Sequence, residues 1–146
     1  MLLRFFFAGV ILLLILAGCS IADDYPDLID SDLLPYFRAV YPDHRIVLMI
    51  EGDANDDGIY DLVVVFRADP DHNHKATVFS TPDGFLLTES MPAPFQDVDM
   101  EFININDKPP NELMISGRRG INFGLGILRF YDDQWVDLFG GLDGCC

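Results

Sequence analysis

An acidic loop between two apolar stretches places the strongest constraint on the fold of this chain. Residues 52–61 alternate side-chain oxygens with other residues and include Gly58, which lacks a Cβ and so permits a sharp turn. Apolar, β-branched stretches flank the loop at residues 46–50 and 62–66, as expected for buried strands. Alternating oxygens before such a turn are typical of calcium loops. The predicted ligands are Asp53, Asn55, Asp57, the Ile59 carbonyl and Asp61, and a metal-free turn rich in Asp and Asn is the alternative.

The loop departs from a complete EF-hand in two respects. Val64 stands where an EF-hand supplies a bidentate glutamate, and a strand rather than a helix follows the loop. With these departures the pattern resembles the loops of FG-GAP and VCBS repeats, which build integrin-like propellers. The resemblance implies the same five calcium ligands.

The layout of loop and strands occurs a second time, about fifty residues further along the chain. Asn104, Asn106, Lys108 and Glu112 take the places of the four side-chain ligands of the first loop. Because the ammonium of Lys108 and the ring of Pro109 replace the third ligand and the turn glycine, we expect the second loop to be metal-free. Turn signals at residues 82–84 and 132–134 separate matching apolar segments at residues 77–79, 85–87, 127–128 and 135–137.

Each repeat therefore predicts a four-stranded unit of the size of a propeller blade. Two such units cannot close a ring, which needs about four blades or more. We expect a mainly β domain of two propeller-blade-like repeats, preceded by one helix that begins near Asp32 and ends before Pro42. Either the two sheets pack face to face with the helix over one end, or the chain associates with others. Trp135 is expected to fill core.

The first 18 residues predict an export signal. Arg4 precedes an apolar run from residue 5 to residue 17, which is too short for a spanning helix. Residues 16–19, Leu-Ala-Gly-Cys, resemble a bacterial lipobox, and the resemblance implies that acylated Cys19 anchors the chain in the bilayer at the extracytoplasmic face of a bacterial membrane. The predicted organisation is a signal peptide at 1–18, a lipidated tether at 19–30, a two-repeat β domain at 31–142 and an exposed Cys-Cys tail at 143–146.

The charge and the motifs narrow the classes of function. A formal net charge of −15 repels phosphate backbones, so we expect no nucleic-acid partner. The chain has no P-loop and no nucleophile elbow, and Gly124-Leu125-Gly126 lacks the strand-to-helix context of a dinucleotide fingerprint. Outside its thiols, the sequence therefore gives little support to an enzyme.

Cys145 and Cys146 are the two cysteines that remain once Cys19 is acylated. We expect both thiols in an exposed tail, because Gly144 supplies a flexible joint and chain ends are usually unrestrained. Thiolates prefer soft cations, and accessible thiols also exchange with disulfides. A frayed end without a function is the alternative.

Two other groups of side chains are weaker candidates. His72 and His74 stand at alternate positions near carboxylates, which permits a zinc or copper site, although a solvated hairpin loop is the favoured interpretation. His44 follows the predicted helix and can complement its dipole. Arg118 and Arg119 are adjacent and predict either ion pairs within a turn or a docking point for an anion.

The lipobox at residues 16–19, the chain length and the ending at residues 144–146 together resemble the Cys-Cys-COOH (seleno)lipoproteins of the SaoC family, which belong to a selenocysteine-assisted organometal system. In that family the penultimate residue can be selenocysteine, and here it is Cys145. The resemblance implies a surface lipoprotein that works beside a membrane transporter and an organomercury-lyase-like enzyme.

Three functions remain open as hypotheses. In the first, Cys145 and Cys146 capture a soft metal or organometal, with organomercury as the expected ligand, and relay it to a membrane transport and detoxification system. In the second, the same pair is an extracytoplasmic thiol-disulfide partner. In the third, the chain is a calcium-stabilised adhesion or binding module for which the tail is incidental.

Overall fold

The computed structural model describes residues 32–142 and 145–146, and this part of the chain is mainly β. The predicted signal peptide, Cys19 and the tether to residue 30 lie outside the described residues. The elements are α1 (Leu33–Val40), β1 (Ile46–Gly52), β2 (Asp61–Asp69), β3 (His72–Thr81), β4 (Gly84–Leu87), β5 (Met91–Ala93), β6 (Gln96–Ile103), β7 (Glu112–Arg119), β8 (Asn122–Tyr131) and β9 (Gln134–Asp137). No helix within this described part is both long and apolar enough to span a bilayer.

The strands form two antiparallel sheets, one from each predicted repeat. Sheet A has the order β1-β2-β3-β4, with the short strand β5 paired to β3, and sheet B has the order β6-β7-β8-β9. With the exception of β5, strands that follow one another along the chain are neighbours in both sheets, as the repeated pattern of loops and turns predicts. The long predicted loops at residues 53–60 and 104–111 join the first and second strands of their sheets.

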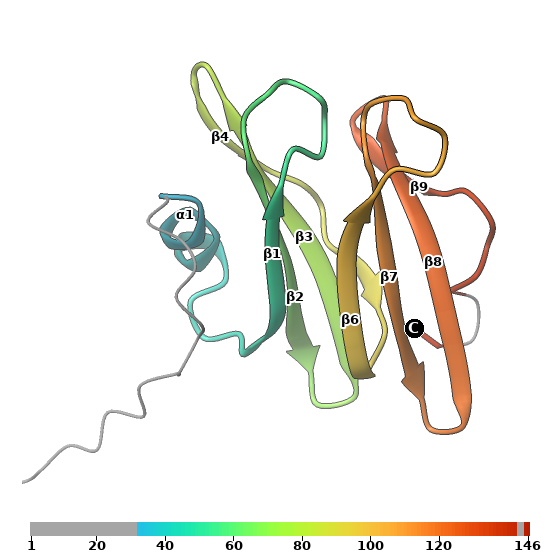
Figure 1. The fold of residues 1–146 in the computed structure, drawn as a ribbon. Helices are drawn as coiled ribbons and strands as arrows, with labels where there is room; N and C mark the ends of the chain where they lie inside the picture. Colours follow the sequence, from blue (N-terminus) through green and yellow to red (C-terminus); the bar gives the residue numbers. More distant parts are fainter. Residues whose placement is uncertain (1–31, 143–144) are drawn as a thin grey trace, which may run out of the picture.

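The helix and the two sheets are stacked as three layers in the order α1, sheet A, sheet B (Figure 1). Successive side chains of a strand point to opposite faces. On β2, Leu62, Val64 and Phe66 therefore face α1, whereas Val63 and Val65 face sheet B. Both faces of β2 are buried, which explains why its sequence is a continuous apolar run.

The helix covers a face of sheet A, and our expectation that it covers one end was wrong. Leu33 and Phe37 are buried against β2 and β3, and the Phe37 and Phe66 rings meet edge to face with centroids 5.4 Å apart. A face of apolar strands offers more surface to remove from water than a sheet end does. Val40, the last residue of α1, remains exposed.

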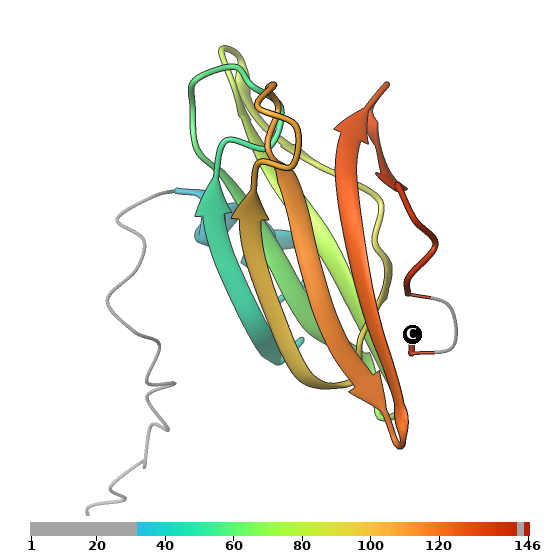
Figure 2. The same ribbon diagram turned by 45° about the vertical axis from the view of Figure 1, so that its right-hand side comes forward.

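Side chains from both sheets form the core between them. The Phe79 and Phe130 rings are in contact, with centroids 4.3 Å apart, and the Trp135 indole Nε1–H donates to Thr77 Oγ1 at 3.0 Å. Strands β1 and β6 run beside each other where the two sheets come closest (Figure 2). The sheets thus pack face to face, which was the first of the two expected arrangements.

Candidate functional site

The chain that carries the thiol pair is bonded to the edge of sheet B. After β9, the Leu138 N–H donates to the Ile127 carbonyl at 2.9 Å, and the Leu125 N–H donates to the Gly141 carbonyl at 3.1 Å. Asp137 Oδ1 accepts the N–H groups of residues 139 and 140 and so stabilises the turn between these two contacts. The segment from 138 to 142 therefore extends along β8 towards the cysteines.

Three glycines allow the segment and the thiols to lie against β8. A Cβ added to Gly124 would clash with Cys145 Sγ, one added to Gly126 would clash with Leu142, and one added to Gly141 would clash with the backbone of Leu125. Glycine within a strand is typical of places where another chain approaches closely. Gly124-Leu125-Gly126 thus forms the seat of the thiol-bearing segment, a role that its alternating glycines could have indicated.

Burial at this seat overturns the expectation of an exposed tail. Cys145 is fully buried and Cys146 is partly buried. Both cysteines are free, and their Sγ atoms lie 3.1 Å apart. Our prediction was wrong because it treated the segment as unrestrained, whereas the hydrogen bonds to β8 and the side chain of Leu142 in the core between the sheets hold it in place.

The environment of the pair favours thiols over thiolates. Burial and, after it, the adjacent Cys145 thiol together raise the pKa of Cys146 to about 12, while the positive charge of Arg119 acts in the opposite direction. At neutral pH Cys146 is therefore protonated. A metal that binds here must displace a proton.

The predicted calcium loop is held together by its own side chains. Asp53 accepts the N–H groups of Asp57 and Gly58 at 3.1 and 2.9 Å, and Asp57 Oδ1 accepts the N–H of Ile59 at 2.8 Å. Asn55 Oδ1 also accepts the Asp57 N–H at 3.1 Å. These bonds hold the alternating oxygens of the loop on a fixed backbone.

Asp61 closes the base of the same loop. Its Oδ2 accepts the Ala54 N–H at 2.9 Å and its Oδ1 accepts the Ser80 N–H at 3.0 Å. Burial, together with the charges of Asp57 and Asp53, raises the pKa of Asp61 to about 6 against the effect of these two hydrogen bonds. The carboxylate therefore lies where a positive charge would relieve both burial and repulsion.

The loop fits calcium in its donor chemistry, although its carboxylates have not converged on one point. No three His, Cys, Asp or Glu side chains among the residues that the structure describes come together in the manner of a metal site. Each carboxylate oxygen in the loop has a second lone pair, so a hydrogen bond from a backbone N–H does not prevent coordination. Oxygen donors are the kind of ligand that calcium prefers, and the five on this short loop supply most of the roughly six to eight that the ion takes.

The second loop has a similar hydrogen-bonded frame, but Asn104 and Lys108 stand in the places of the carboxylates of Asp53 and Asp57. Glu112 Oε2 accepts the Ile105 N–H at 3.1 Å, as Asp61 accepts that of Ala54, and Asn106 Oδ1 accepts the Lys108 N–H at 3.0 Å. Burial alone would raise the pKa of Glu112. The hydrogen bond from the Ile105 N–H and the interaction with Arg129 outweigh it and hold the pKa of Glu112 below its ordinary value. The Arg129 guanidinium, which is hydrogen-bonded to Glu112, supplies a positive charge at the base of this loop.

The remaining candidates lie apart from one another. His72 Nδ1 is bonded to Asp69 at 2.8 Å and His74 Nδ1 to Ser90 Oγ at 3.0 Å, so the two imidazoles have separate partners. Arg118 pairs with Asp97. Arg119 Nη2 donates to the Asp71 carbonyl at 3.0 Å and its guanidinium lies 5.5 Å from the Phe95 ring centroid. These contacts favour the structural interpretation of each group.

Sequence reasoning missed a buried amine between the sheets. Lys75 is almost fully buried, its Nζ has no hydrogen-bond partner, and it lies 4.4 Å from the Trp135 ring centroid. Burial lowers the pKa of Lys75 to about 7. A single lysine within a strand forms no motif, so no sequence pattern indicated this environment.

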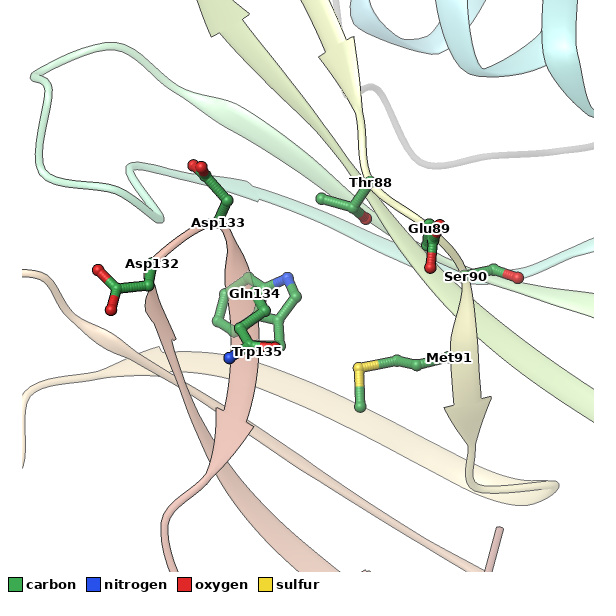
Figure 3. Close-up of a pocket in the computed structure, with 8 residues that line it drawn as sticks. All are labelled: Thr88, Glu89, Ser90, Met91, Asp132, Asp133, Gln134 and Trp135. Atoms are coloured by element: carbon green, nitrogen blue, oxygen red, sulfur yellow. The ribbon is translucent and has the colours of Figure 1, made fainter.

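A pocket of about 430 Å³ lies beside Trp135 (Figure 3). Residues from both repeats line it, with Thr88 to Met91 on one side and Asp132 to Trp135 on the other. Its lining includes the acidic residues Glu89, Asp132 and Asp133. Neither cysteine belongs to this pocket. No family model, characterised protein or solved structure matches this chain.

Proposed function

We propose that Cys145 and Cys146 form a capture site for a soft metal or organometal, on a lipoprotein anchored by Cys19 at the extracytoplasmic face of a bacterial membrane. The observation that supports this most is the pair of free thiols 3.1 Å apart, with one buried and the other partly accessible. Soft cations bind thiolate sulfur in preference to the oxygen ligands that dominate an acidic surface.

An organometal cation that needs one sulfur at a time fits the pair better than a bare two-coordinate ion. A near-linear ion needs sulfurs on opposite sides, which adjacent residues 3.1 Å apart do not supply. Cys146 reacts first as R–Hg–X + Cys–SH → Cys–S–Hg–R + H⁺ + X⁻. Exchange with the Cys145 thiol then transfers R–Hg⁺ from one sulfur to the other and returns the proton to Cys146.

Relay to a membrane transporter and an organomercury-lyase-like enzyme is the physiological part of this proposal. It is supported by the resemblance to the SaoC family. A protonated, partly buried acceptor holds its cargo less firmly than an exposed thiolate, and this favours onward transfer.

The experiment is a titration of the full chain with an organomercurial, read by mass spectrometry, in a Cys19→Ser background that leaves two thiols. Cys146→Ser should slow capture at least tenfold, since only buried Cys145 remains, whereas Cys145→Ser should retain the rapid step. Unchanged stoichiometry after both residues become serine would refute the capture site.

We also propose that the two sheets are propeller-blade-like repeats of the FG-GAP and VCBS kind, and that the first loop holds calcium. The ligands would be Asp53, Asn55, Asp57, the Ile59 carbonyl and Asp61, and the ion would neutralise the loop. Calcium should raise the melting temperature of the full chain. Asp53→Asn should diminish that rise and Asn104→Asp, at the equivalent position of the second loop, should not; equal shifts in all three proteins would argue against the assignment.

A further inference from the structure

The buried amine of Lys75 and the pocket beside Trp135 belong neither to the thiol pair nor to the two loops. The Lys75 side chain lies between the sheets, and the residue is 1% exposed. Its Nζ finds no hydrogen-bond partner within the part of the chain that the structure describes. Buried polar groups nearly always have such a partner. Lys75 therefore offers a group that an incoming molecule can engage.

The amine lies next to the inner wall of the pocket. Met91 pairs with Lys75 across β5 and β3, so both side chains point to the face of sheet A that packs on sheet B. Met91 and Trp135 line the pocket, and Figure 3 shows the Met91 side chain extending from β5 towards Trp135. Lys75 Nζ lies 4.4 Å from the Trp135 ring centroid but does not itself line the pocket. The side chains of Met91 and Trp135 therefore separate the amine from the pocket.

Burial changes the reactivity of this amine. It lowers the pKa of Lys75 to about 7, so about half of the molecules carry an unprotonated amine at neutral pH. An unprotonated amine has a free lone pair and attacks carbonyl carbon, which is why desolvated lysines serve as Schiff-base nucleophiles. An exposed lysine is almost entirely protonated at the same pH. Lys75 is thus able to react with a carbonyl group under conditions in which an exposed lysine reacts slowly.

The lining of the pocket limits which carbonyl compound can enter. Glu89, Asp132 and Asp133 line it without a lysine or arginine, so it repels anions such as keto acids. A charge of either sign would also have to be buried beside Lys75, which is costly. Met91 and Trp135 offer apolar contact, and a volume of about 430 Å³ is sufficient for a small molecule. The pocket therefore suits a small, uncharged carbonyl compound with an apolar body.

We propose that the pocket beside Trp135 admits a small uncharged aldehyde, which condenses reversibly with Lys75. The reaction is R–CHO + Lys75–NH₂ → R–CH=N–Lys75 + H₂O, in which the carbonyl oxygen leaves as water with the two amine hydrogens and no oxidant or reductant is needed. The unprotonated imine carries no charge, so burial favours it over the ammonium. The Met91 side chain is unbranched and flexible, and its displacement opens the way from the pocket to Nζ.

Reductive trapping of the imine on the full chain tests this site. Butanal is added at pH 7 with cyanoborohydride, which converts an imine into a stable secondary amine, and peptide mass spectrometry locates the adduct. The chain has two lysines, and Lys108 is the exposed one, so it serves as the internal control. Lys75 should be labelled at least tenfold faster than Lys108. Glyoxylate, an aldehyde that carries a carboxylate, should not show this preference for Lys75.

A variant of the pocket wall tests the route to the amine. Gln134 lines the pocket and is exposed, so Gln134→Trp should narrow the pocket and slow the labelling of Lys75 at least fivefold without changing that of Lys108. Val136→Trp adds the same ring on the opposite face of β9 and should leave both rates near those of the wild type. Labelling of Lys75 no faster than that of Lys108, an equal preference for Lys75 with glyoxylate, or a Lys75 rate that Gln134→Trp does not change would each overturn the proposal.

Discussion

Lys75 and Glu112 are both buried, and the structure accommodates their charges in opposite ways. The Glu112 carboxylate accepts hydrogen bonds from Arg129 and from the Ile105 N–H. The Lys75 ammonium has no hydrogen-bond partner and only the face of Trp135 to attract it. Burying a charge is costly unless it is paired, so the buried Lys75 ammonium destabilises the folded state.

Replacing Lys75 by methionine should stabilise the protein. The variant keeps an unbranched side chain and loses the burial cost of the ammonium, which we expect to raise the free energy of unfolding at pH 7 by at least about 1 kcal/mol. Urea denaturation measures the difference. Lys108→Met, at the exposed lysine of the second loop, is the matched control and should change stability by less than about 0.5 kcal/mol.

The same lysine predicts a pH dependence. Its pKa falls from 10.5 to about 7 on folding, so the unfolded chain binds more protons between these values. Wild-type stability should therefore rise relative to Lys75→Met as the pH increases from about 7 to about 10, and the difference should stay constant below pH 7. A constant difference across the whole range would contradict the lowered pKa.

Gly124 controls access to the buried thiol. Gly124→Ala should displace Cys145 from its seat, since the new methyl group occupies the position of the sulfur. We expect Cys145 to be alkylated by iodoacetamide at least tenfold faster in the variant, as measured by peptide mass spectrometry. Gly117→Ala creates a comparable clash with Pro94 and should leave the Cys145 rate near that of wild type.

At the scale of elements, the two loops share a backbone conformation but differ in whether a positive charge lies beside the carboxylate at the base of the loop. The Asp61 carboxylate is buried and is repelled by the charges of Asp57 and Asp53, whereas the Glu112 carboxylate forms an ion pair with Arg129. Asp56 and Asp107, at matching places in the two loops, both have positive φ, at 64° and 57°. The backbone was therefore retained when the ligands diverged.

Arg129→Met should destabilise the second loop by roughly 3 kcal/mol, because it leaves the Glu112 carboxylate buried without its charged partner. Denaturant unfolding with the Glu112→Gln and double variants would complete a double-mutant cycle. The ion pair of Arg118 with Asp97 is half-exposed, so Arg118→Met should cost less than about 1 kcal/mol. Equal costs for the two arginine variants would show that burial of the pair has no energetic weight.

Local sequence patterns predicted most elements but only parts of their lengths. The turn signals at 82–84 and 132–134 lie at the observed turns before β4 and β9. Strand β3 begins at His72 rather than near Thr77. Its first part is polar, and the buried Asn73 side chain is satisfied there by a hydrogen bond to the Pro94 carbonyl, so the apolar pattern does not mark the start of the strand. Strand β5 was missed since three residues carry no periodicity.

The candidate site was predictable in its chemistry and not in its environment. Residue types alone identified the thiols and the loop oxygens. The burial of Cys145 depends on contacts with Gly124, 21 positions away, and on the path of the chain along β8. Such contacts are tertiary, and no local pattern encodes them.

At the scale of the whole molecule, sheet A is shared by both cores and couples them. Alternate residues of β2 belong to the core beneath α1 and to the core between the sheets. The described domain should therefore unfold as one cooperative unit.

Phe37→Ala tests this coupling, because Phe37 is fully buried in one core and Trp135 contacts the other. The substitution should cost about 3–5 kcal/mol. The denaturation midpoint followed by Trp135 fluorescence should shift as far as the midpoint followed by far-ultraviolet circular dichroism. A Trp135 transition that stays at its wild-type midpoint would show that the sheets unfold independently.

Because α1 covers one face of sheet A, a further repeat can be added to the layers of this fold at one end only. A further repeat placed before β1 would have to displace α1 from the hydrophobic side chains that seat it. A repeat added after β9 would meet the face of sheet B that carries Met114 and Ile127, and the corresponding face of the first repeat, which carries Val63 and Thr77, is the one that packs on the other sheet. Gene duplication could thus lengthen this architecture from its carboxyl side alone.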